Sequence, residues 1–486
     1  MTYSLHDGKQ HGLNDHIKEL LPKSFGLVLI PDAGSNDIEE CKKLKDNGST
    51  VIIFDHHICE VDNPYAFVIN NQSSDYPNKE LSGVGVTWQF CRYLDSLLKQ
   101  NFADQYLDLV ALGDDADMMS MKSIETKHLI NKGLNEIRNP FIAYMHEKNK
   151  FSLGDTLTPI GVAFYIAPFV NAIVRSGTMD EKTLIFKSML KTEAFKRVPS
   201  TKRGHKPGDE ESIVEQAIRV ATNVKARQTK AQENGLQILE HKIEENNLLD
   251  HKVLLFLLEP GEIDRNIAGL IANKFMAKYQ RPVCILTKVV DDVNEVSYQG
   301  SARGCDKTGI TDFKDVCSAT GVCMYTAGHE GAFGVGILKD NIQVFIEKTD
   351  AALKNASDEA IYYVDYIYSG AHINPQNILD IASMEPLWGK DIDEAEVAVE
   401  HLKVSPDDVT IYTKRNITIK IKTESGVALM LFNAKESDVE KLQTNNTGFV
   451  DINVVGKCNA NEWNGFITPQ IFISDYEIID SNKYFF

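Results

Sequence analysis

Two short apolar runs near the start of the chain each end in a polar cluster, and this pattern constrains the fold most. Residues 25–30 (FGLVLI) and 51–54 (VIIF) are continuous apolar stretches, as expected for strands buried on both faces of a sheet. The first run ends in a Pro-Asp-Ala-Gly turn, a helix is expected from about Asp37, and the second run ends at residues 55–57, Asp-His-His. Open α/β sheets bind ligands at the carboxyl ends of parallel strands. The sequence therefore predicts an α/β fold with a ligand site at that sheet edge.

The composition excludes several classes of protein. With 486 residues and 43% hydrophobic content, the chain suits an ordinary globular protein of two to four domains. It contains no apolar run of about 18 residues and no signal-peptide pattern, so we expect a cytoplasmic protein without a membrane span. Eight cysteines without a Cys-x-x-Cys pair disfavour thiolate zinc sites and a disulfide framework. A net charge of −18 disfavours a protein that coats nucleic acid, but a nuclease needs only a few local cations.

The secondary structure expected along the rest of the chain changes twice. Helices are expected from about 83 to 247, and an apolar stripe along 209–245 predicts one long helix that connects domains. A second α/β unit is expected from 253–258 through the glycine-rich segment at 328–336. From about residue 361 the chain turns β-rich, which predicts a small C-terminal β-barrel.

Carboxylates and imidazoles gather in three places along the first 120 residues. They are Asp32, the Asp55-His56-His57 triplet, and a cluster that ends at Asp117. Oxygen and nitrogen ligands without thiolates suit Mn²⁺ or Mg²⁺, and two such ions can activate water and neutralise a phosphate. Taken alone, an Asp after a strand is usually a helix cap, so only the joint pattern points to phosphoester hydrolysis.

In this order, the segments resemble the DHH family of phosphoesterases, and within it the RecJ type. LVLIPDAGSND resembles a family segment in which a strand ends in Asp, and FDHHICE resembles the motif that names the family. LSGVGVTWQF is similar to the helix start that follows, and ALGDDADMMS to the segment that ends in Ala-Asp. The resemblance implies that Asp32, His56 and Asp117 bind metal, that His57 faces the scissile phosphate, and that Asp55 orients the histidines. Asp114 and Asp115 stand where the family often has uncharged residues, so no role is carried onto them.

Later segments resemble the substrate-binding parts of RecJ. IAPFVNAIVRSG matches a RecJ segment, NIAGLIANKF is similar to the first helix of the DHH-associated domain, GSARG matches its Ser-x-Arg, and NEWNG resembles the RecJ oligonucleotide-binding (OB) barrel. A glycine cluster alone is more often a tight turn, and a tryptophan there can equally be a half-buried strand residue. The substrate contacts implied by the resemblance are Asn171, Arg175, Ser301, Arg303, Gly328, His329 and Trp463.

The resemblance implies four regions, and one motif of the family is missing from the sequence. We expect a DHH domain at 1–208, a connecting helix at 209–247, a DHH-associated domain at 248–358 and an OB-like domain at 359–486. The family opens with a strand that ends in Asp-x-Asp-Gly, and this motif is not in the sequence; residues 5–14 resemble the stretch after it. We therefore expect the DHH sheet to lack its first strand and the metal site to lack ligands.

Three explanations of this gap are open. A misassigned start or split gene would leave the motif on a separate piece, a degenerate relative would bind DNA without cutting it, or a one-metal site would work slowly. Because Asp32, His56, His57 and Asp117 are all present, we favour a truncated or split exonuclease. A buried anionic cluster without cations is costly and has no reason to persist in an inactive protein.

The leading hypothesis is a Mn²⁺- or Mg²⁺-dependent exonuclease on single-stranded DNA, 5′ to 3′ by family analogy, with His57 and Arg303 stabilising the phosphate charge. The alternatives are a phosphodiesterase of short oligonucleotides or cyclic dinucleotides, and an inactive single-strand-binding relative. Expected partners are single-stranded DNA and, besides it, a separate N-terminal piece or repair and replication proteins. The basic segment 196–208 (KRVPSTKRGHKPG) is expected to be a flexible loop. It could contact DNA or simply be solvated, and we prefer solvation.

Overall fold

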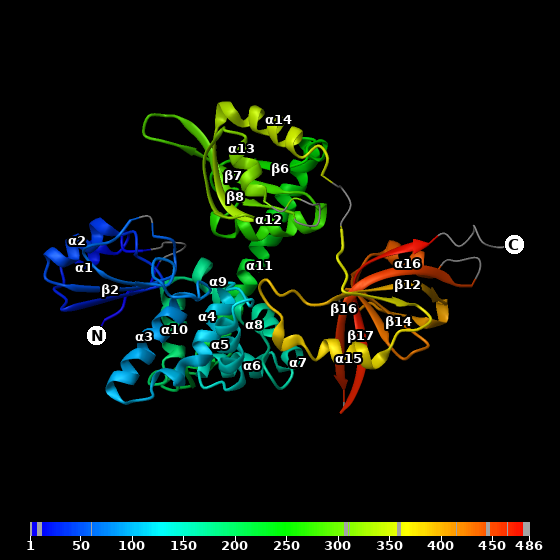
Figure 1. Ribbon diagram of the computed structural model, residues 1–486, viewed down its shortest axis with the longest axis horizontal. Coiled ribbons are helices and arrows are strands. Elements are labelled where there is room, and N and C mark those ends of the chain that lie inside the picture. The colour runs from blue at the N-terminus through cyan, green and yellow to red at the C-terminus, as the bar shows by residue number, and fades with distance from the viewer. Residues whose placement is uncertain are drawn as a thin grey trace. The chain divides into compact units, whose positions relative to one another are not determined.

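The computed structural model divides into two compact units, each assembled from three stretches of the chain. Figure 1 labels their helices and strands. Unit 1 comprises Met1–Lys23, Asn139–Lys148 and Ile166–Ile361; unit 2 comprises Ser24–Arg138, Asn149–Tyr165 and Tyr362–Phe486. The four-region division expected from the sequence stays a prediction. The structure describes residues 2–6, 12–59, 61–305, 310, 312–356, 361–414, 416–443, 448–463 and 465–479, without the side chains of Gln443 and Trp463. Residues 7–11, within the stretch compared with the family's N-terminal segment, lie outside this set.

Unit 2 begins with a three-stranded parallel sheet in the order β1-β2-β3. Its strands are β1 (Leu27–Pro31), β2 (Thr50–Asp55) and β3 (Phe67–Asn70), and α2 (Ile38–Asp46) connects the first two. The positions of the two predicted strands and of the helix after Asp37 are thus confirmed, but β1 is not buried on both faces as predicted, because Leu27 and Leu29 are exposed. Their apolar side chains explain the arrangement, because β2 is buried along most of its length.

Helices follow this sheet in unit 2. α3 (Gly83–Leu98) packs on the sheet through a cluster that includes Phe54, Leu81 and Trp88. The remaining helices before residue 166 in this unit are η1 (Ala103–Tyr106), α4 (Leu107–Ala116), α5 (Ile124–Asn135), α7 (Lys150–Leu153) and α8 (Pro159–Tyr165).

The C-terminal part of unit 2 is a seven-stranded mixed sheet in the order β11-β12-β16-β17-β15-β14-β13. A continuous apolar cluster that includes Val397, Ile419 and Ile452 forms its core. The pairing found among the described residues runs from β11 to β13, so the predicted barrel is not shown and stays a prediction. The elements are β11 (Tyr366–Ser369), α15 (Pro375–Ala382), η5 (Glu385–Leu387), β12 (Glu396–Val404), η6 (Pro406–Asp408), β13 (Val409–Tyr412), β14 (Ile417–Lys422), β15 (Ala428–Ala434), α16 (Glu436–Gln443), β16 (Val450–Trp463) and β17 (Phe466–Ile479).

Unit 1 is organised around α11 (Ile213–Glu245), the long helix that the apolar stripe predicts. It begins at residue 213 because Ser212 and Glu215 form a capping box there. A mixed five-stranded sheet follows in the order β6-β7-β8-β10-β9, and α12 packs on one of its faces. The elements of this unit besides α11 are α1 (Ile17–Leu20), α6 (Pro140–Lys148), α9 (Ala167–Ser176), α10 (Met179–Met189), β4 (Arg197–Pro199), β5 (Glu210–Ser212), η2 (Leu248–Asp250), β6 (Leu254–Leu258), α12 (Arg265–Tyr279), β7 (Val283–Val290), β8 (Val296–Arg303), α13 (Phe313–Ala319), β9 (Cys323–His329), β10 (Ala332–Leu338), η4 (Lys339–Asn341) and α14 (Ile342–Ala352).

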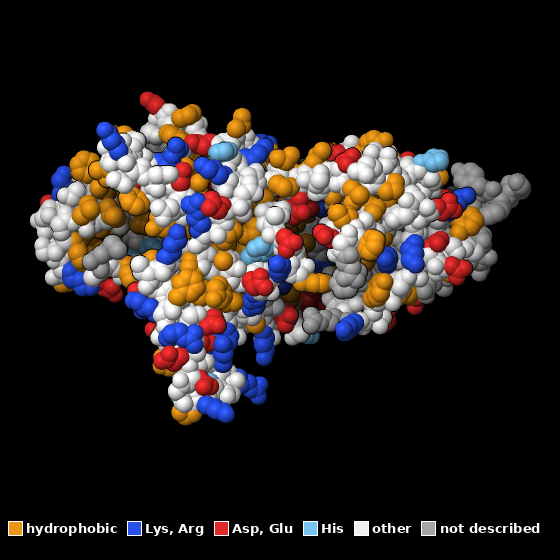
Figure 2. Space-filling view, turned by 90° about the horizontal axis from the view of Figure 1, so that it is seen from below, with side chains coloured by type: hydrophobic (Ala, Val, Ile, Leu, Met, Phe, Trp, Pro, Cys, Tyr) orange, Lys and Arg blue, Asp and Glu red, His pale blue; other side chains and the backbone are white. Residues whose placement is uncertain are grey.

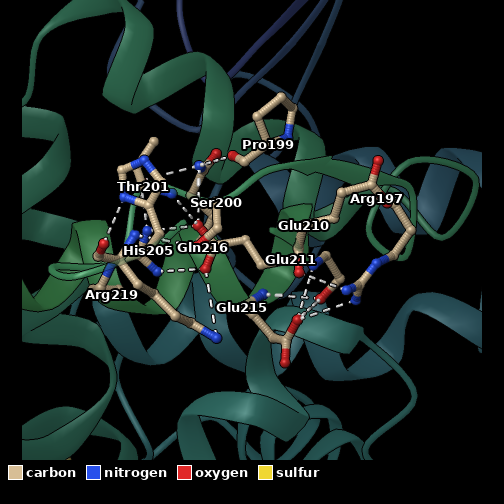
Figure 3. A network of polar contacts seen from close by, with 12 residues as sticks. Arg197, Pro199, Ser200, Thr201, His205, Glu210, Glu211, Glu215, Gln216 and Arg219 are labelled. Atoms are coloured by element: carbon tan, nitrogen blue, oxygen red, sulfur yellow. Dashed lines mark hydrogen bonds and ion pairs between the residues drawn. The ribbon is translucent and has the colours of Figure 1, made fainter. Parts of the chain in front are cut away.

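The segment 196–208 is not a free loop, because β4 and β5 pair antiparallel at its base. Glu211 on β5 is almost fully buried and accepts two hydrogen bonds from Arg219, each of 2.7 Å, in the network drawn in Figure 3. The bidentate bond to Arg219, helped by the Thr201 amide, lowers the pKa of Glu211 to about 2 although burial opposes this. A buried carboxylate thus ties the segment to the first turns of α11.

We predict that Glu211→Gln lowers the free energy of unfolding by about 2 kcal/mol at neutral pH, because the charge-assisted pair with Arg219 is lost. The folded-state pKa of Glu211 lies below its unfolded value, so its contribution is complete above the unfolded pKa and disappears as pH falls toward about 2. Denaturant unfolding of both proteins across this range measures the effect. A stability difference that stays constant with pH would contradict it.

One stretch, Pro159–Ser176, is long and apolar enough to cross a membrane by length and composition alone, with a mean hydropathy of 1.3. The structure divides it into α8 and α9 at Ile166, and 39% of it is buried inside the protein. Core helices of soluble proteins pass the same test. One such stretch is weak evidence, and the expected absence of a membrane span stays a prediction.

Candidate active site

Asp32 stands directly after β1, at the carboxyl edge of the parallel sheet. Its φ of 63° lies in the left-handed region, and its amide donates to the Phe54 carbonyl at 2.7 Å, which continues the pairing with β2. The Gly83 amide donates to Asp32 Oδ1 at 3.1 Å, and a Cβ at Gly83 would lie only 2.4 Å from that oxygen. A glycine at the start of α3 is therefore required for this contact, and it orients the Asp32 carboxylate.

His56 joins Asp32 to Asp117, which caps the end of α4. Its Nε2 atom lies 3.3 Å from Asp32 Oδ1 and 3.1 Å from Asp117 Oδ2, and the possible ligand atoms of all three residues lie within 4.8 Å of one another. The His56 side chain is 10% exposed, whereas those of Asp32 and Asp117 are 55% and 49% exposed. The structure thus brings together the three residues predicted as metal ligands, on a site open to solvent.

Asp55 and His57 form a second pair beside this group. Asp55, at the end of β2, is buried; its Oδ1 accepts from His57 Nδ1 at 2.7 Å and from the His56 amide at 2.8 Å, and its Oδ2 accepts from the Ser35 amide at 3.1 Å. Burial would raise the pKa of Asp55, but the bonds from His57 and Ser35 hold it well below its usual range. The same bond to Asp55 raises the pKa of His57, against the effect of burial.

The group formed by Asp32, His56 and Asp117 fits a divalent cation. Around Mn²⁺ or Mg²⁺, neighbouring oxygen and nitrogen ligands lie about 3 Å apart, close to the 3.1 and 3.3 Å found between His56 Nε2 and the two carboxylates. His56 Nε2 is buried and makes no hydrogen bond among the described residues. Buried polar atoms rarely stay unsatisfied, so a cation at this point would satisfy it.

Two further carboxylates of α4 lie under this site. Asp114 is fully buried and accepts from the Ser82 hydroxyl at 2.6 Å and from the Ser82 amide at 3.0 Å. Burial raises the pKa of Asp114 to about 7 although the Ser82 bonds oppose the shift, and burial together with the charge of Asp114 raises the pKa of Asp115 to about 8. Sequence patterning did not indicate that both would be buried, because helices expose polar residues far more often.

We predict that Asp115→Asn stabilises the metal-free protein by at least about 2 kcal/mol at neutral pH. The folded-state pKa of Asp115 lies above the unfolded value, so its stability cost grows as pH rises from about 4 toward 8 and is absent below about 4. Thermal unfolding in EDTA across this range measures the difference. The exposed control Asp155→Asn, whose side chain is 88% exposed, should show no such pH dependence; an equal effect in both would contradict the argument.

The predicted phosphate contacts Ser301, Arg303 and His329 lie in unit 1. Arg303 on β8 pairs with Ala332 on β10, which pairs with His329 on β9, and Ser301 lies two residues before Arg303. Side chains of directly paired residues point to the same face of a sheet, so these three share one face. A Cβ at Gly269 would lie 2.4 Å from Arg303 Nη2, so α12 approaches the guanidinium closely. Gly328 has a φ of 130°, which favours glycine there.

Arg175 and Asn171 lie four residues apart on α9, which puts them on one face of that helix. Burial lowers the pKa of Arg175, and burial together with the charge of Arg175 lowers the pKa of Arg303, so the two guanidinium groups are near neighbours. Neither makes an ion pair in the described part of the chain. Arg175 also lines a cavity of about 380 Å³ with Arg227, Gln228 and Asn266. Asp264 also lines this cavity and Arg227 is paired with Glu181, so Arg175 and Arg303 are the cations of this region that suit an anion.

Trp463 ends β16 in unit 2, and its side chain is not described, so a contact with DNA stays a prediction. Sequence analysis also missed supporting residues. Asn70, at the end of β3, donates to the His57 carbonyl at 2.9 Å and to Ser35 Oγ at 3.1 Å. Asn70 is the last residue of the third parallel strand. The expectation that ligand sites lie at the carboxyl ends of parallel strands, which pointed to Asp32 and Asp55, would therefore have pointed to Asn70 too.

Comparison with known proteins identifies the family. The sequence model described as "DHH family, N-terminal domain" matches residues 2–113. The putative SPbeta prophage-derived single-strand DNA-specific exonuclease YorK of Bacillus subtilis (strain 168) is 32% identical over 484 residues, which are 99% of this chain and 82% of YorK. The chain belongs to the DHH family. The single-stranded-DNA-specific exonuclease RecJ of Bacillus subtilis is 24% identical to this DHH protein over 96% of the chain and 56% of RecJ.

Solved structures show the same fold. RecJ from Thermus thermophilus in complex with Mn²⁺ superimposes on this DHH protein with a TM-score of 0.69 at 19% identity, over 95% of this chain and 63% of RecJ. Its complex with Mg²⁺ gives a TM-score of 0.61 at 16% identity, over 95% and 68%. The protein is thus a mixed α/β member of the DHH family, related to RecJ and YorK across nearly its whole length.

Proposed function

We propose that this DHH protein is a Mn²⁺- or Mg²⁺-dependent exonuclease that hydrolyses the phosphodiester bonds of single-stranded DNA from 5′ to 3′, in DNA repair, recombination or replication. The observation that carries the proposal is His56 Nε2, held between the carboxylates of Asp32 and Asp117 beside the Asp55–His57 pair. The relatives YorK and RecJ are named as single-strand-DNA-specific exonucleases, which supports the choice of substrate.

A divalent cation bound by Asp32, His56 and Asp117 would supply neutralisation of phosphate charge and a lowered pKa for water. The protein's own contribution comes from the neighbouring pair. Asp55 accepts from His57 Nδ1, which directs the other ring nitrogen away from Asp55. Because this bond raises the pKa of His57, the ring holds a proton that it can donate to an oxygen of the phosphate as charge develops.

In this proposal unit 1 holds the strand. Ser301, Arg303 and His329 share one sheet face, and Arg175 and Asn171 share one face of α9. A guanidinium group can donate two parallel hydrogen bonds to the oxygens of one phosphate. The glycine at 269 lets α12 approach the Arg303 guanidinium, and the glycine at 328 leaves the backbone there without a side chain. The region 359–486, with Trp463, is proposed to bind further nucleotides as an OB-like domain.

The proposal also covers where the protein works and which partners it has. We propose that it works in the cytoplasm without a membrane span. Repair or replication proteins are proposed as partners beside single-stranded DNA.

The test uses purified protein with Mn²⁺ and three substrates: a linear single strand labelled at the 5′ end, the same strand labelled at the 3′ end, and a closed single-stranded circle. We expect the 5′ label to be released first as a mononucleotide and the circle to stay intact. Cleavage of the circle would contradict exonuclease action, and earlier release of the 3′ label would contradict the polarity. Cleavage of dinucleotides alone would favour the phosphodiesterase alternative.

A further inference from the structure

The segment between β4 and β5 carries a concentration of positive charge that the proposed site does not use. We call residues 200–209 the basic loop. Lys202, Arg203, His205 and Lys206 lie on it, and all residues from 201 to 209 are exposed. No Asp or Glu occurs from Ala194 to Gly208, although the whole protein has a net charge of −18. Across the face drawn in Figure 2, Lys and Arg side chains lie among those of Asp and Glu.

The backbone of the basic loop is held in one conformation. The Ser200 amide donates to the Asp209 carbonyl at 2.8 Å, which closes the base, and the Lys206 amide donates to Asp209 Oδ2 at 2.7 Å. The His205 amide and Nδ1 both bond the Lys202 carbonyl, at 3.1 and 2.8 Å. Gly204, with a φ of 83°, supplies the left-handed residue that this turn requires. These bonds define the turn that carries the basic side chains.

A buried anchor fixes this loop to α11. Glu211 accepts from the Thr201 amide at 2.9 Å and from Arg219, which also donates to Thr201 Oγ1 at 2.6 Å (Figure 3). Gln216 adds bonds to Glu211 and to Thr201 Oγ1, at 3.2 and 3.1 Å. Arg219 thus pairs with the buried carboxylate of Glu211 within this network. Lys202 reaches Glu211 only at 3.7 Å, and Arg203 and Lys206 make no ion pair in the part of the chain that the structure describes.

We propose that the basic loop binds the phosphodiester backbone of single-stranded DNA, as a docking element additional to the residues assigned above. The identity of the ligand rests on the proposed function. The loop carries Lys202, Arg203 and Lys206 against the single carboxylate of Asp209, and a strand of phosphates provides several counter-charges to this excess at once.

The chemistry of the loop favours a nucleic acid over an acidic protein. Protein interfaces are anchored by buried aromatic or aliphatic side chains, and residues 201–209 (TKRGHKPGD) contain none. Contacts made by Lys and Arg alone recognise a backbone without reading its sequence. The loop is therefore suited to hold any strand, as a nuclease without sequence preference requires.

The test replaces three cations together, in Lys202→Gln/Arg203→Gln/Lys206→Gln, in the full-length protein. The matched control is Lys23→Gln/Lys339→Gln/Lys354→Gln, three exposed lysines outside the loop. Binding of a long fluorescent single strand is measured by anisotropy in EDTA, where no cleavage occurs, over a series of salt concentrations. Each phosphate contact on a single strand contributes about −0.7 to the slope of log K against log salt. We expect the slope of the loop variant to be shallower by about 2, and its affinity at ~0.1 M salt to be roughly 10- to 100-fold weaker.

The control should bind as the wild type does, and thermal unfolding should show that both triple variants are folded. Wild-type affinity and slope in a folded loop variant would overturn the proposal and leave an acidic protein as the partner of this loop. An equal loss in the control would also overturn it, since the effect would then be one of net charge. If the wild type cuts no DNA while the loop variant still binds it more weakly, the proposed function fails and this inference stands.

Discussion

Asp32→Asn is expected to lower metal-dependent release of nucleotides from single-stranded DNA by at least about 100-fold, because in the proposed mechanism this carboxylate holds the cation and would lose its charge. Asparagine is the suitable replacement. It tolerates the left-handed φ of 63° better than alanine, and its side-chain oxygen can still accept the hydrogen bond from Gly83. The variant should therefore fold normally and differ only at the metal.

Two measurements check this prediction. Initial rates over a series of Mn²⁺ concentrations should show a lower maximal rate and a higher Mn²⁺ requirement. The matched control is Asp46→Asn, an exposed carboxylate at the end of α2 in the same unit, which should behave as the wild type does. A rate within a few-fold of the wild type, with an unchanged Mn²⁺ requirement, would show that Asp32 is only a helix-capping or surface residue.

The second large effect is expected for Asp55→Asn, which should reduce the rate roughly 100- to 10,000-fold, the range spanned by carboxylates that orient a catalytic or metal-bound histidine. The bond from His57 Nδ1 to Asp55 holds the ring and raises its pKa. An amide cannot stabilise the imidazolium in the same way. The pKa of His57 should therefore fall toward its ordinary value.

The pH profile separates this mechanism from simple misfolding. In the proposed mechanism His57 acts in its protonated form, so activity is expected to fall as pH rises through its raised pKa. In Asp55→Asn this alkaline limb should move to lower pH, and NMR titration of the His57 ring should show the same shift. The exposed control Asp62→Asn should change neither. An unchanged alkaline limb in a folded Asp55→Asn protein would contradict the role given to the pair.

Much of the parallel sheet could be predicted from sequence, because its strands are continuous apolar runs and polar residues mark where they end. The same rule pointed to Asp32 and His56, whereas Asp117 at the end of α4 was identified through its cluster of carboxylates and the family resemblance; the structure places the three together. Their role as metal ligands remains a prediction. Asn70 was missed only because the third strand is short and was not considered.

Other features depend on contacts between distant residues, which composition does not reveal. The segment 196–208 was predicted to be a flexible loop from its Pro and Gly content, but the structure pairs its first residues as β4 with β5, and buried Glu211 binds both the Thr201 amide and Arg219. The flexibility of the remaining loop stays a prediction. No role was carried onto Asp114 and Asp115 from the sequence, and the structure shows that tertiary packing buries both of these carboxylates of α4. The C-terminal strands were predicted correctly, whereas their closure into a barrel depends on pairings that alternation cannot specify.

The central claim is that a cation held by Asp32, His56 and Asp117 enables this protein to digest single-stranded DNA from an end. The most direct measurement is the release of labelled mononucleotides from a linear single strand by the wild type in Mn²⁺, by the wild type in EDTA, and by Asp32→Asn in Mn²⁺. The account predicts steady release in the first case and at least about 100-fold less in the other two. No release by the wild type in Mn²⁺, or equal release in all three, would contradict it.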